Sequence, residues 1–238
     1  MRSLVVLPTY NEIENIEKML RALRTIVPNA DILVVDDGSP DATGARAEAL
    51  ALELANITVL HRTEKNGLGS AYRAGFAWGL ERGYDAFVEI DCDFSHDPAA
   101  LPRMFELAED HEVVIGSRYV AGGAIPAWAT SRLLLSKGGN RYASAMLGLN
   151  VADSTAGYRV YRKSALEKIG YDTVHADGYG FQIEMTYRAR RAGASIVETP
   201  ISFTDRTLGE SKMSSNIIVE ALWLVTKWGV ARWFERTK

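Results

Sequence analysis

The feature of this chain that most restricts its fold is a regular alternation of short apolar runs with longer segments of helical periodicity. The apolar runs lie at residues 4–7, 31–35, 57–60, 86–90 and 113–115. The helical segments lie between them, at about residues 13–24, 41–54, 70–82 and 98–110. Such alternation predicts a mostly parallel sheet, and continuously apolar strands are typical of a sheet covered by helices on both faces. The sequence therefore predicts an α/β, Rossmann-like fold.

The pattern changes after Gly116. Residues 119–126 are rich in glycine and alanine and predict a loop, and residues 131–147 predict a helix that carries three basic residues. A short strand near residues 158–161, a helix near 182–192 and a strand at 195–199 are expected next. The chain shows no internal repeat or low-complexity linker. We therefore expect a single domain over residues 1–238.

Composition narrows the class of protein. The chain has 238 residues, 47% of them hydrophobic, and a net charge of -3, so it can bury a full core and has no charge excess that would indicate nucleic-acid binding. It begins with a strand-like run instead of an export signal. Its single cysteine, Cys92, excludes an internal disulfide and a cysteine-based zinc site. We expect a cytoplasmic protein.

Two carboxylates, Asp91 and Asp93, directly follow the apolar run at residues 86–90. Ligands of open α/β sheets bind at the carboxyl ends of the strands, so two acids there can hold one divalent cation beside a phosphate ligand. An alternative is an acidic turn before a helix, because Asp97-Pro98 is a good helix start.

Other polar groups follow the first two strands. Asn11 can cap the first helix, and Asp37 can accept hydrogen bonds from a base or a ribose. The alternative is that residues such as Asn11 and Asp36 only cap helices and form turns. Gly67-Leu-Gly69 is weak evidence for phosphate binding, since the chain has neither a P-loop nor a dinucleotide fingerprint. These glycines more simply allow close packing.

Several motifs occur in one order along the chain. They are Pro8-Thr-Tyr-Asn-Glu12, Val35-Asp-Asp-Gly-Ser-Pro-Asp41, Asn66-Gly-Leu-Gly69, Asp91-Cys-Asp93, Gly116-Ser-Arg-Tyr119 and Asp205-Arg-x-x-Gly-x-Ser-Lys212. This order resembles that of the polyprenol-phosphate mannose synthases, which belong to the family-two, GT-A-type inverting glycosyltransferases. The resemblance runs from about residue 3 to residue 212, and the last motif narrows it to this group.

The resemblance implies transfer of mannose from GDP-mannose to the phosphate of a polyprenyl phosphate, with Mg²⁺ or Mn²⁺. It implies a nucleotide-sugar half at residues 1–117 and an acceptor half at residues 118–212. Asp91 and Asp93 match metal-site residues, whereas the third ligand position holds Ser95, whose hydroxyl is a weaker ligand than a carboxylate. The expected donor-binding residues are Pro8, Tyr10, Glu12, Val35, Asp37, Asp91, Cys92, Asp93, Arg206 and Lys212.

The reaction itself requires positive charge. Arg206 and Lys212 can stabilise the departing nucleoside diphosphate, although a solvated basic loop is the alternative. An acceptor phosphate is largely dianionic at neutral pH and needs no general base, but it needs cations to offset its repulsion from the donor. Arg118, Arg132 and Ser136 are the candidates for the acceptor phosphate. We therefore expect Asp91, Asp93, Arg118, Arg206 and Lys212 to be catalytic.

The C-terminal segment at residues 213–238 predicts a helix with Trp223, Trp228 and Trp233. Charged residues interrupt this segment, so its longest uncharged run is too short to span a membrane. The three tryptophans predict no single membrane face on a helical wheel, and we expect partial docking on the domain with an exposed, interfacial tip. A lipid acceptor implies peripheral association with the cytoplasmic face of a membrane, and an integral-membrane partner is plausible. Another donor, such as UDP-glucose, and a catalytically silent nucleotide-sugar-binding subunit remain alternatives.

Overall fold

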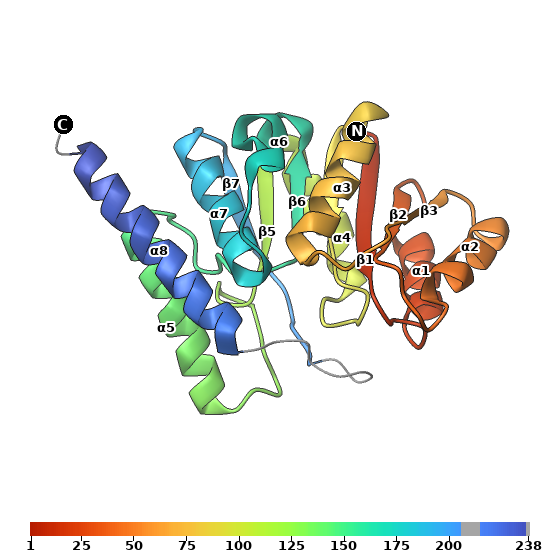
Figure 1. Cartoon of the computed structure of the whole chain (residues 1–238), viewed down its shortest axis with the longest axis horizontal. Helices are drawn as coiled ribbons and strands as arrows, with labels where there is room; N and C mark the ends of the chain where they lie inside the picture. Colours follow the sequence, from red (N-terminus) through yellow and green to blue (C-terminus); the bar gives the residue numbers. More distant parts are fainter. Residues whose placement is uncertain (206–214, 237–238) are drawn as a thin grey trace.

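The computed structural model describes residues 1–205 and 215–236, and its centre is a seven-stranded sheet in the order β3-β2-β1-β4-β6-β5-β7 (Figure 1). The strands are β1 (Ser3–Thr9), β2 (Asp31–Asp36), β3 (Ile57–His61), β4 (Ala86–Glu89), β5 (Val113–Ser117), β6 (Arg159–Arg162) and β7 (Ile196–Pro200). Only β6 runs antiparallel to its neighbours in this described sheet. The predicted α/β class with a mostly parallel sheet is confirmed.

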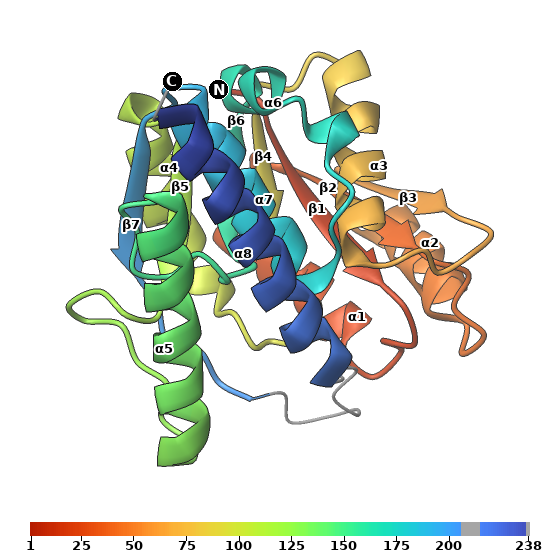
Figure 2. The same cartoon turned by 60° about the vertical axis from the view of Figure 1, so that its left-hand side comes forward.

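Helices cover both faces of the sheet. They are α1 (Ile16–Ile26), α2 (Thr43–Glu53), α3 (Leu68–Glu81), α4 (Leu101–Asp110), α5 (Thr130–Leu147), α6 (Lys163–Ile169), α7 (Gly178–Arg191) and α8 (Ser215–Arg236), with short 3₁₀ turns η1 (Pro98–Ala100) and η2 (Tyr171–Thr173). One core cluster joins the sheet to α1, α2 and α4, and the other joins it to α3, α5, α6, α7 and α8. Helices α5 and α8 lie side by side at one end of the molecule (Figures 1 and 2).

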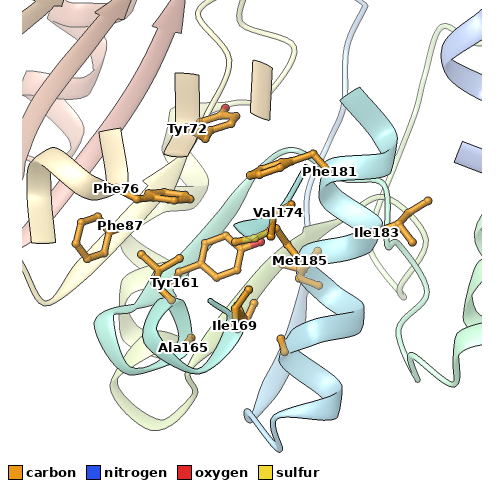
Figure 3. Close-up of a cluster of buried hydrophobic side chains, with 14 of the residues drawn as sticks. Tyr72, Phe76, Phe87, Tyr161, Ala165, Ile169, Val174, Phe181, Ile183 and Met185 are labelled. Atoms are coloured by element: carbon orange, nitrogen blue, oxygen red, sulfur yellow. The ribbon is translucent and has the colours of Figure 1, made fainter. Parts of the chain in front are cut away.

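An aromatic cluster fills the space between α3, the sheet and α7 (Figure 3). Phe76 is at its centre, with the rings of Phe87 and Tyr161 packed edge-on at 5.9 and 6.0 Å. Tyr72, one turn earlier on α3, stacks against Phe76 and Phe181 at 6.1 and 6.2 Å. Each of these side chains is fully buried, so the cluster packs rigidly against the adjoining part of the sheet.

One local prediction is wrong. Asn11 does not cap the first helix, because the N-cap position is Asn15 and Asn11 has a left-handed φ of 56°. Its backbone N–H donates instead to Ser39 Oγ at 3.1 Å. Asparagine tolerates this conformation better than most residues. Asn11 therefore ties the loop after β1 to the loop after β2.

Candidate functional site

The predicted motifs at the ends of β1, β2 and β4 meet around one cavity of about 420 Å³, called here the donor cavity. Its lining includes Pro8, Tyr10, Glu12, Asp37, Asp91, Cys92 and Asp93, all of them predicted donor-binding residues. It is completed by Thr9, Lys65, Gly67, Leu68, Ala71, Asp177, Gly178 and Glu220. The structure thus brings together segments that lie far apart in the chain, from Pro8 to Glu220.

The two central carboxylates are held differently. Asp93 is nearly buried, and its Oδ1 accepts a hydrogen bond from the Ser95 backbone N–H at 2.9 Å. The tight turn that follows Asp93 places Phe94 at a left-handed φ of 59°, a conformation that costs energy for a non-glycine residue. Asp91 is 34% exposed, and the Tyr72 hydroxyl donates to its Oδ1 over a long 3.5 Å. Asp93 is therefore fixed, while Asp91 presents its carboxylate to the cavity.

Ser95 is placed differently from the prediction. Its side chain is buried and is not part of the donor-cavity lining. What it contributes in the structure is the backbone N–H that orients Asp93. Val35 is also fully buried in the core and does not line the cavity. Their roles as a metal ligand and a donor contact remain predictions.

A second layer of buried polar groups lies behind the carboxylates. Glu89, at the end of β4, accepts a hydrogen bond from Gln182 Nε2 at 2.8 Å, and its burial raises its pKa to about 7. His96 is also buried, which lowers the pKa of its imidazole to about 4 and keeps the ring neutral at pH 7. Its Nδ1 lies 3.8 Å from Asp91 Oδ2. Neutral His96 thus adds no positive charge to the site.

Asp37 lies on the nucleoside side of the cavity. Burial raises its pKa above the ordinary value, although Arg62 opposes the shift with Nη1 at 3.1 Å from Asp37 Oδ1. The geometry of this pair is too poor for a hydrogen bond, so it is an ion pair only. Neighbouring Asp36 instead shapes the turn, accepting hydrogen bonds from the Thr9 and Ser39 hydroxyls at 3.1 and 2.6 Å. Asp36 is thus the turn former, and Asp37 faces the cavity.

The donor cavity is strongly acidic. Six of the described lining residues are acidic, whereas one, Lys65, is basic, and its Nζ lies over the Tyr10 ring at 4.3 Å from the centroid. An anionic ligand would be repelled from such a cavity unless cations accompany it. The predicted cations Arg206 and Lys212 lie outside the described residues.

A divalent metal fits this donor set. In residues 1–205 and 215–236, no group of three or more His, Cys, Asp or Glu side chains is arranged to hold a metal ion alone. Asp91 and Asp93 nevertheless supply two hard carboxylate oxygens on one cavity wall. Mg²⁺ in particular is held by one or two carboxylates together with substrate phosphates and water. The residues present therefore suit a metal that arrives with a phosphate ligand.

The N-terminus of α7 forms the opposite wall of the donor cavity. Asp177 Oδ1 accepts a hydrogen bond from the Gly69 backbone N–H at 3.0 Å. A Cβ atom at Gly67 would lie only 2.1 Å from Asp177 Oδ2, so a side chain there would displace the carboxylate. The prediction that these glycines allow close packing is confirmed. Because Asp177 occupies the position where an anion would meet the start of α3, that helix end is closed to phosphate.

Arg118 makes a buried ion pair. Its Nε and Nη2 donate to the two oxygens of Asp153, each at 2.7 Å, and its backbone N–H donates to Asp153 Oδ2 at 3.0 Å. Burial opposes ionisation of the Asp153 carboxyl, but the hydrogen bonds and charge of Arg118 prevail and hold its pKa below the ordinary value. Nη2 also donates to Thr155 Oγ1 at 2.8 Å. Arg118 therefore has a structural role in addition to the predicted one.

The other predicted acceptor residues are close to Arg118. Arg132 lies 3.9 Å over the Trp128 ring, and the Arg118 guanidinium lies 5.7 Å from the same ring. Arg132 also pairs with Asp205 at 2.9 Å, at a partly exposed position. Ser136 Oγ accepts a hydrogen bond from the Tyr119 hydroxyl at 2.6 Å. The structure thus gathers Arg118, Arg132 and Ser136 around Trp128.

Trp128, Arg132 and Ser136 of this cluster also line a largely apolar cavity of about 190 Å³ between α5, α7 and α8, called here the acceptor groove. Leu135, Ala143, Ile183, Leu222 and Val225 supply much of its apolar lining, and Arg132, Ser136, Asn140, Thr155 and Tyr179 supply polar groups. The start of α7 separates it from the donor cavity, because Asp177 and Gly178 line the donor cavity and Tyr179 lines the groove.

Several residues in and around the two cavities could not be selected from the sequence. Asp153, Asp177 and Glu220 are isolated acids in segments with no strand-end signal, and Trp128 lies between the predicted loop and the predicted helix that follows it. Lys65 is part of a polar stretch after β3, and its proximity to Tyr10 depends on the folded loops. Glu184 accepts a hydrogen bond from the Ala176 backbone N–H at 3.3 Å and so supports the loop before α7.

Comparisons with known proteins give consistent results. The model of "Glycosyl transferase family 2" matches residues 4–170. Undecaprenyl-phosphate mannosyltransferase of Micrococcus luteus is 54% identical over 234 residues, covering 98% of this chain and 96% of that protein. Polyprenol monophosphomannose synthase of Mycolicibacterium smegmatis is 49% identical over 239 residues, covering 100% and 90%.

Solved structures share the fold at low sequence identity. A crystal structure of a mycobacterial protein has a TM-score of 0.68 at 19% identity, covering 94% of this chain and 73% of that one. A mannosyltransferase from Pyrobaculum calidifontis in complex with GDP-Man and Mn²⁺ has a TM-score of 0.59 at 16% identity, covering 97% and 73%. In the part of the chain that the structure describes, none of the helices has the length and apolar character of a membrane span.

Proposed function

This chain is a member of glycosyl transferase family 2 with the GT-A fold, and from this premise we propose that it transfers mannose from GDP-mannose to the phosphate of a polyprenyl phosphate. The products are polyprenyl-phosphate-mannose and GDP. The observation that carries the proposal is the pair of cavities on the two sides of the α7 N-terminus. One is acidic and follows the strand ends, and the other is largely apolar and is also lined by Arg132 and by hydroxyl groups.

The donor belongs in the acidic cavity. Asp37 is placed to accept hydrogen bonds from the nucleoside, and Asp91 and Asp93 face the position of the diphosphate. The relative from Micrococcus luteus is named a mannosyltransferase, and a structural neighbour was solved with GDP-Man and Mn²⁺. These names support mannose and a guanine nucleotide in preference to the alternative donor UDP-glucose. Residues 1–117 then form the donor half of the domain, and residues 118–212 the acceptor half.

Asp91 and Asp93 would hold Mg²⁺ or Mn²⁺ together with the donor phosphates. A bound divalent cation supplies positive charge that stabilises the departing diphosphate. Asp93 is preorganised for this by the Ser95 N–H, so little reorganisation accompanies binding. Arg206 and Lys212, in the predicted basic motif, would add further positive charge.

The acceptor phosphate attacks the anomeric carbon of mannose directly. One of its oxygens forms the new bond to this carbon while the bond from the carbon to the GDP oxygen breaks, which inverts the configuration. A phosphate monoester is largely dianionic at neutral pH, so this step needs no general base from the protein. Arg132 and Ser136, which line the acceptor groove, would bind this phosphate, and Arg118 would support the site from its buried pair.

The polyprenyl chain requires an apolar surface, which the acceptor groove provides. The enzyme would therefore work as a peripheral protein on the cytoplasmic face of a membrane, alone or with an integral-membrane partner. A catalytically silent nucleotide-sugar-binding subunit would not need the acceptor groove beside the donor cavity.

The test is transfer of labelled sugar to a short polyprenyl phosphate from GDP-mannose and, in parallel, from UDP-glucose. The proposal predicts formation of a lipid-linked mannosyl phosphate with Mg²⁺ or Mn²⁺ and none with a chelator. Selective use of UDP-glucose would replace the donor and leave the reaction type intact. Tight binding of GDP-mannose without transfer to any polyprenyl phosphate would indicate the silent subunit.

A further inference from the structure

The exposed apolar side chains of this protein are unevenly distributed. Eight of the twelve large apolar side chains that are exposed in the described part of the chain lie on α5 or α8. On α5 they are Leu134 and Leu135, and on α8 they are Val219, Leu222, Trp223, Val230, Trp233 and Phe234. These two helices lie side by side on the outside of the molecule (Figure 2). Isolated exposed apolar residues are ordinary, but a concentration of this kind marks an interaction surface.

The six exposed apolar residues of α8 form one stripe. At about 100° per residue, their positions fall within an arc of about 120° along the helix. Trp223 and Trp233 lie on the stripe, 60% and 65% exposed. Trp228 lies on the opposite side, where it stacks on Tyr187 of α7 at 6.2 Å. As predicted, the three tryptophans do not share a single face, but two of them, Trp223 and Trp233, do share one.

The other side of α8 is occupied by the protein. Ala221 and Val225 are buried in the core, and Gly229 packs so closely on α5 that an added Cβ would lie 2.7 Å from the Met146 side chain. The helix is thus apolar on both sides, one covered by the domain and one exposed.

The stripe is continuous with the acceptor groove. Leu222 belongs to the stripe and also lines the groove, and exposed Leu135 lines the groove from α5. Arg132 and Ser136 lie on the same helix as Leu135 and line the same groove. A polyprenyl chain entering between Leu135 and Leu222 would therefore pass directly from the surface around the stripe into the groove.

Charge distinguishes a lipid surface from an apolar protein partner. Helix α5 has three basic residues and no acidic one, and α8 has three basic and two acidic residues. The chain as a whole has a net charge of -3, so its two apolar-faced helices are basic in an otherwise acidic protein. Basic residues beside exposed tryptophan and leucine are typical of helices that lie in the headgroup region of an anionic bilayer.

We propose that the α8 stripe and the adjoining Leu134 and Leu135 of α5 form a docking surface for an anionic lipid bilayer. The helices lie in the plane of the interface, with Trp223 and Trp233 at the level of the headgroups. This orientation turns the mouth of the acceptor groove towards the lipid. The choice of a bilayer as the occupant rests on the proposed function, because only a lipid acceptor requires the groove to face a membrane.

The test is sedimentation of the whole chain with vesicles of phosphatidylcholine containing phosphatidylglycerol, and with vesicles of phosphatidylcholine alone. The variant is W223S/W233S, whose substituted residues line neither the donor cavity nor the acceptor groove. The matched control is Leu52→Ser on α2, which removes an even more exposed apolar side chain outside the surface. We expect W223S/W233S to reduce partition into anionic vesicles about tenfold or more, and Leu52→Ser to leave it unchanged.

A second measurement separates docking from catalysis. Transfer to a short, detergent-free soluble acceptor should be equal for wild type and W223S/W233S, whereas transfer to a long acceptor in vesicles should fall with the loss of binding. Equal vesicle binding by wild type and W223S/W233S would overturn the docking surface. Absence of wild-type binding to protein-free vesicles would also overturn it and would indicate an integral-membrane protein as the occupant. Vesicle binding without transfer to any acceptor would contradict the proposed function and leave the surface standing.

Discussion

The buried pair of Arg118 and Asp153 makes the most quantitative prediction. The Asp153 side chain is completely buried and that of Arg118 is 5% exposed, and the two share the bidentate contact described above. Removing one member leaves the other charged and buried without its partner, which costs about 3–5 kcal/mol. We therefore expect Arg118→Met and Asp153→Leu each to lower the free energy of unfolding by about that amount.

The double variant should be far less destabilised than the two single changes together suggest. The double variant leaves no unpaired charge. Its main remaining loss is the Asp153 carboxylate as hydrogen-bond acceptor for the backbone N–H of residue 118. Leaving this N–H without an acceptor costs about 1–3 kcal/mol. Additivity would instead give roughly 6–10 kcal/mol. The measurement is urea unfolding of all four proteins at low temperature, with Arg103→Ala as the control. Arg103 forms an exposed pair with Glu106, and its loss should cost less than about 1 kcal/mol. Additive effects of the two single variants would refute the reasoning.

The same pair has a defined pH dependence. The pKa of Asp153 is lower in the folded protein than its unfolded value of about 3.9. Its contribution to stability is therefore complete above pH 4 and is lost as the pH falls through the folded-state pKa. Urea unfolding of wild type should show this loss below pH 4, and the double variant should lack this component.

Two further predictions concern the cavities. Gly67→Ala and Gly83→Ala both place alanine at a positive φ, +83° and +73°. Each substitution should therefore lower the free energy of unfolding by about 1–3 kcal/mol. Only at Gly67 does the added Cβ also collide with Asp177. Calorimetric titration with GDP-mannose should therefore show weaker binding for Gly67→Ala alone, and equal binding by both variants would contradict the role of Asp177 in the cavity wall. Arg132→Ala should raise the KM for a short polyprenyl phosphate about tenfold and change stability by less than about 1 kcal/mol, because its pair with Asp205 is partly exposed. Arg141→Ala, on the same helix, is the control, and an equal rise in KM for both would refute a specific phosphate contact.

The central part of the fold could be predicted because its signals are local. Each of the first five strands is an apolar run bounded by polar residues, and parallel pairing follows from the intervening helices. The position of β6 could not be predicted in this way. It pairs antiparallel with β4 and β5, and it places fully buried Arg159 where only the assembled chain supplies acceptors. Arg159 donates to the carbonyls of Ser154, Ala156 and Gln182.

The donor side of the site could be predicted for the same reason, since strand ends in a parallel sheet must meet at one edge. The acceptor side depends on α7 and α8 packing against α5, which no single segment encodes. The stripe on α8 was hidden because the buried side of the helix is apolar as well, so the sequence pattern contains two superimposed apolar faces. The burial of Ala221 and Val225 and the position of Trp228 against Tyr187 separate them.

The measurement that tests the central claim most directly is mannose transfer from GDP-mannose to a short polyprenyl phosphate by wild type, Asp93→Asn and Asp97→Asn, each with Mn²⁺ and with a chelator. Asp97→Asn is the matched control, because Asp97 caps the turn at η1 and does not line the donor cavity. We predict metal-dependent transfer by wild type and by Asp97→Asn, and a loss of at least about a hundredfold in Asp93→Asn. Chelator-resistant transfer by wild type, or transfer by Asp93→Asn at the wild-type rate, would contradict the account.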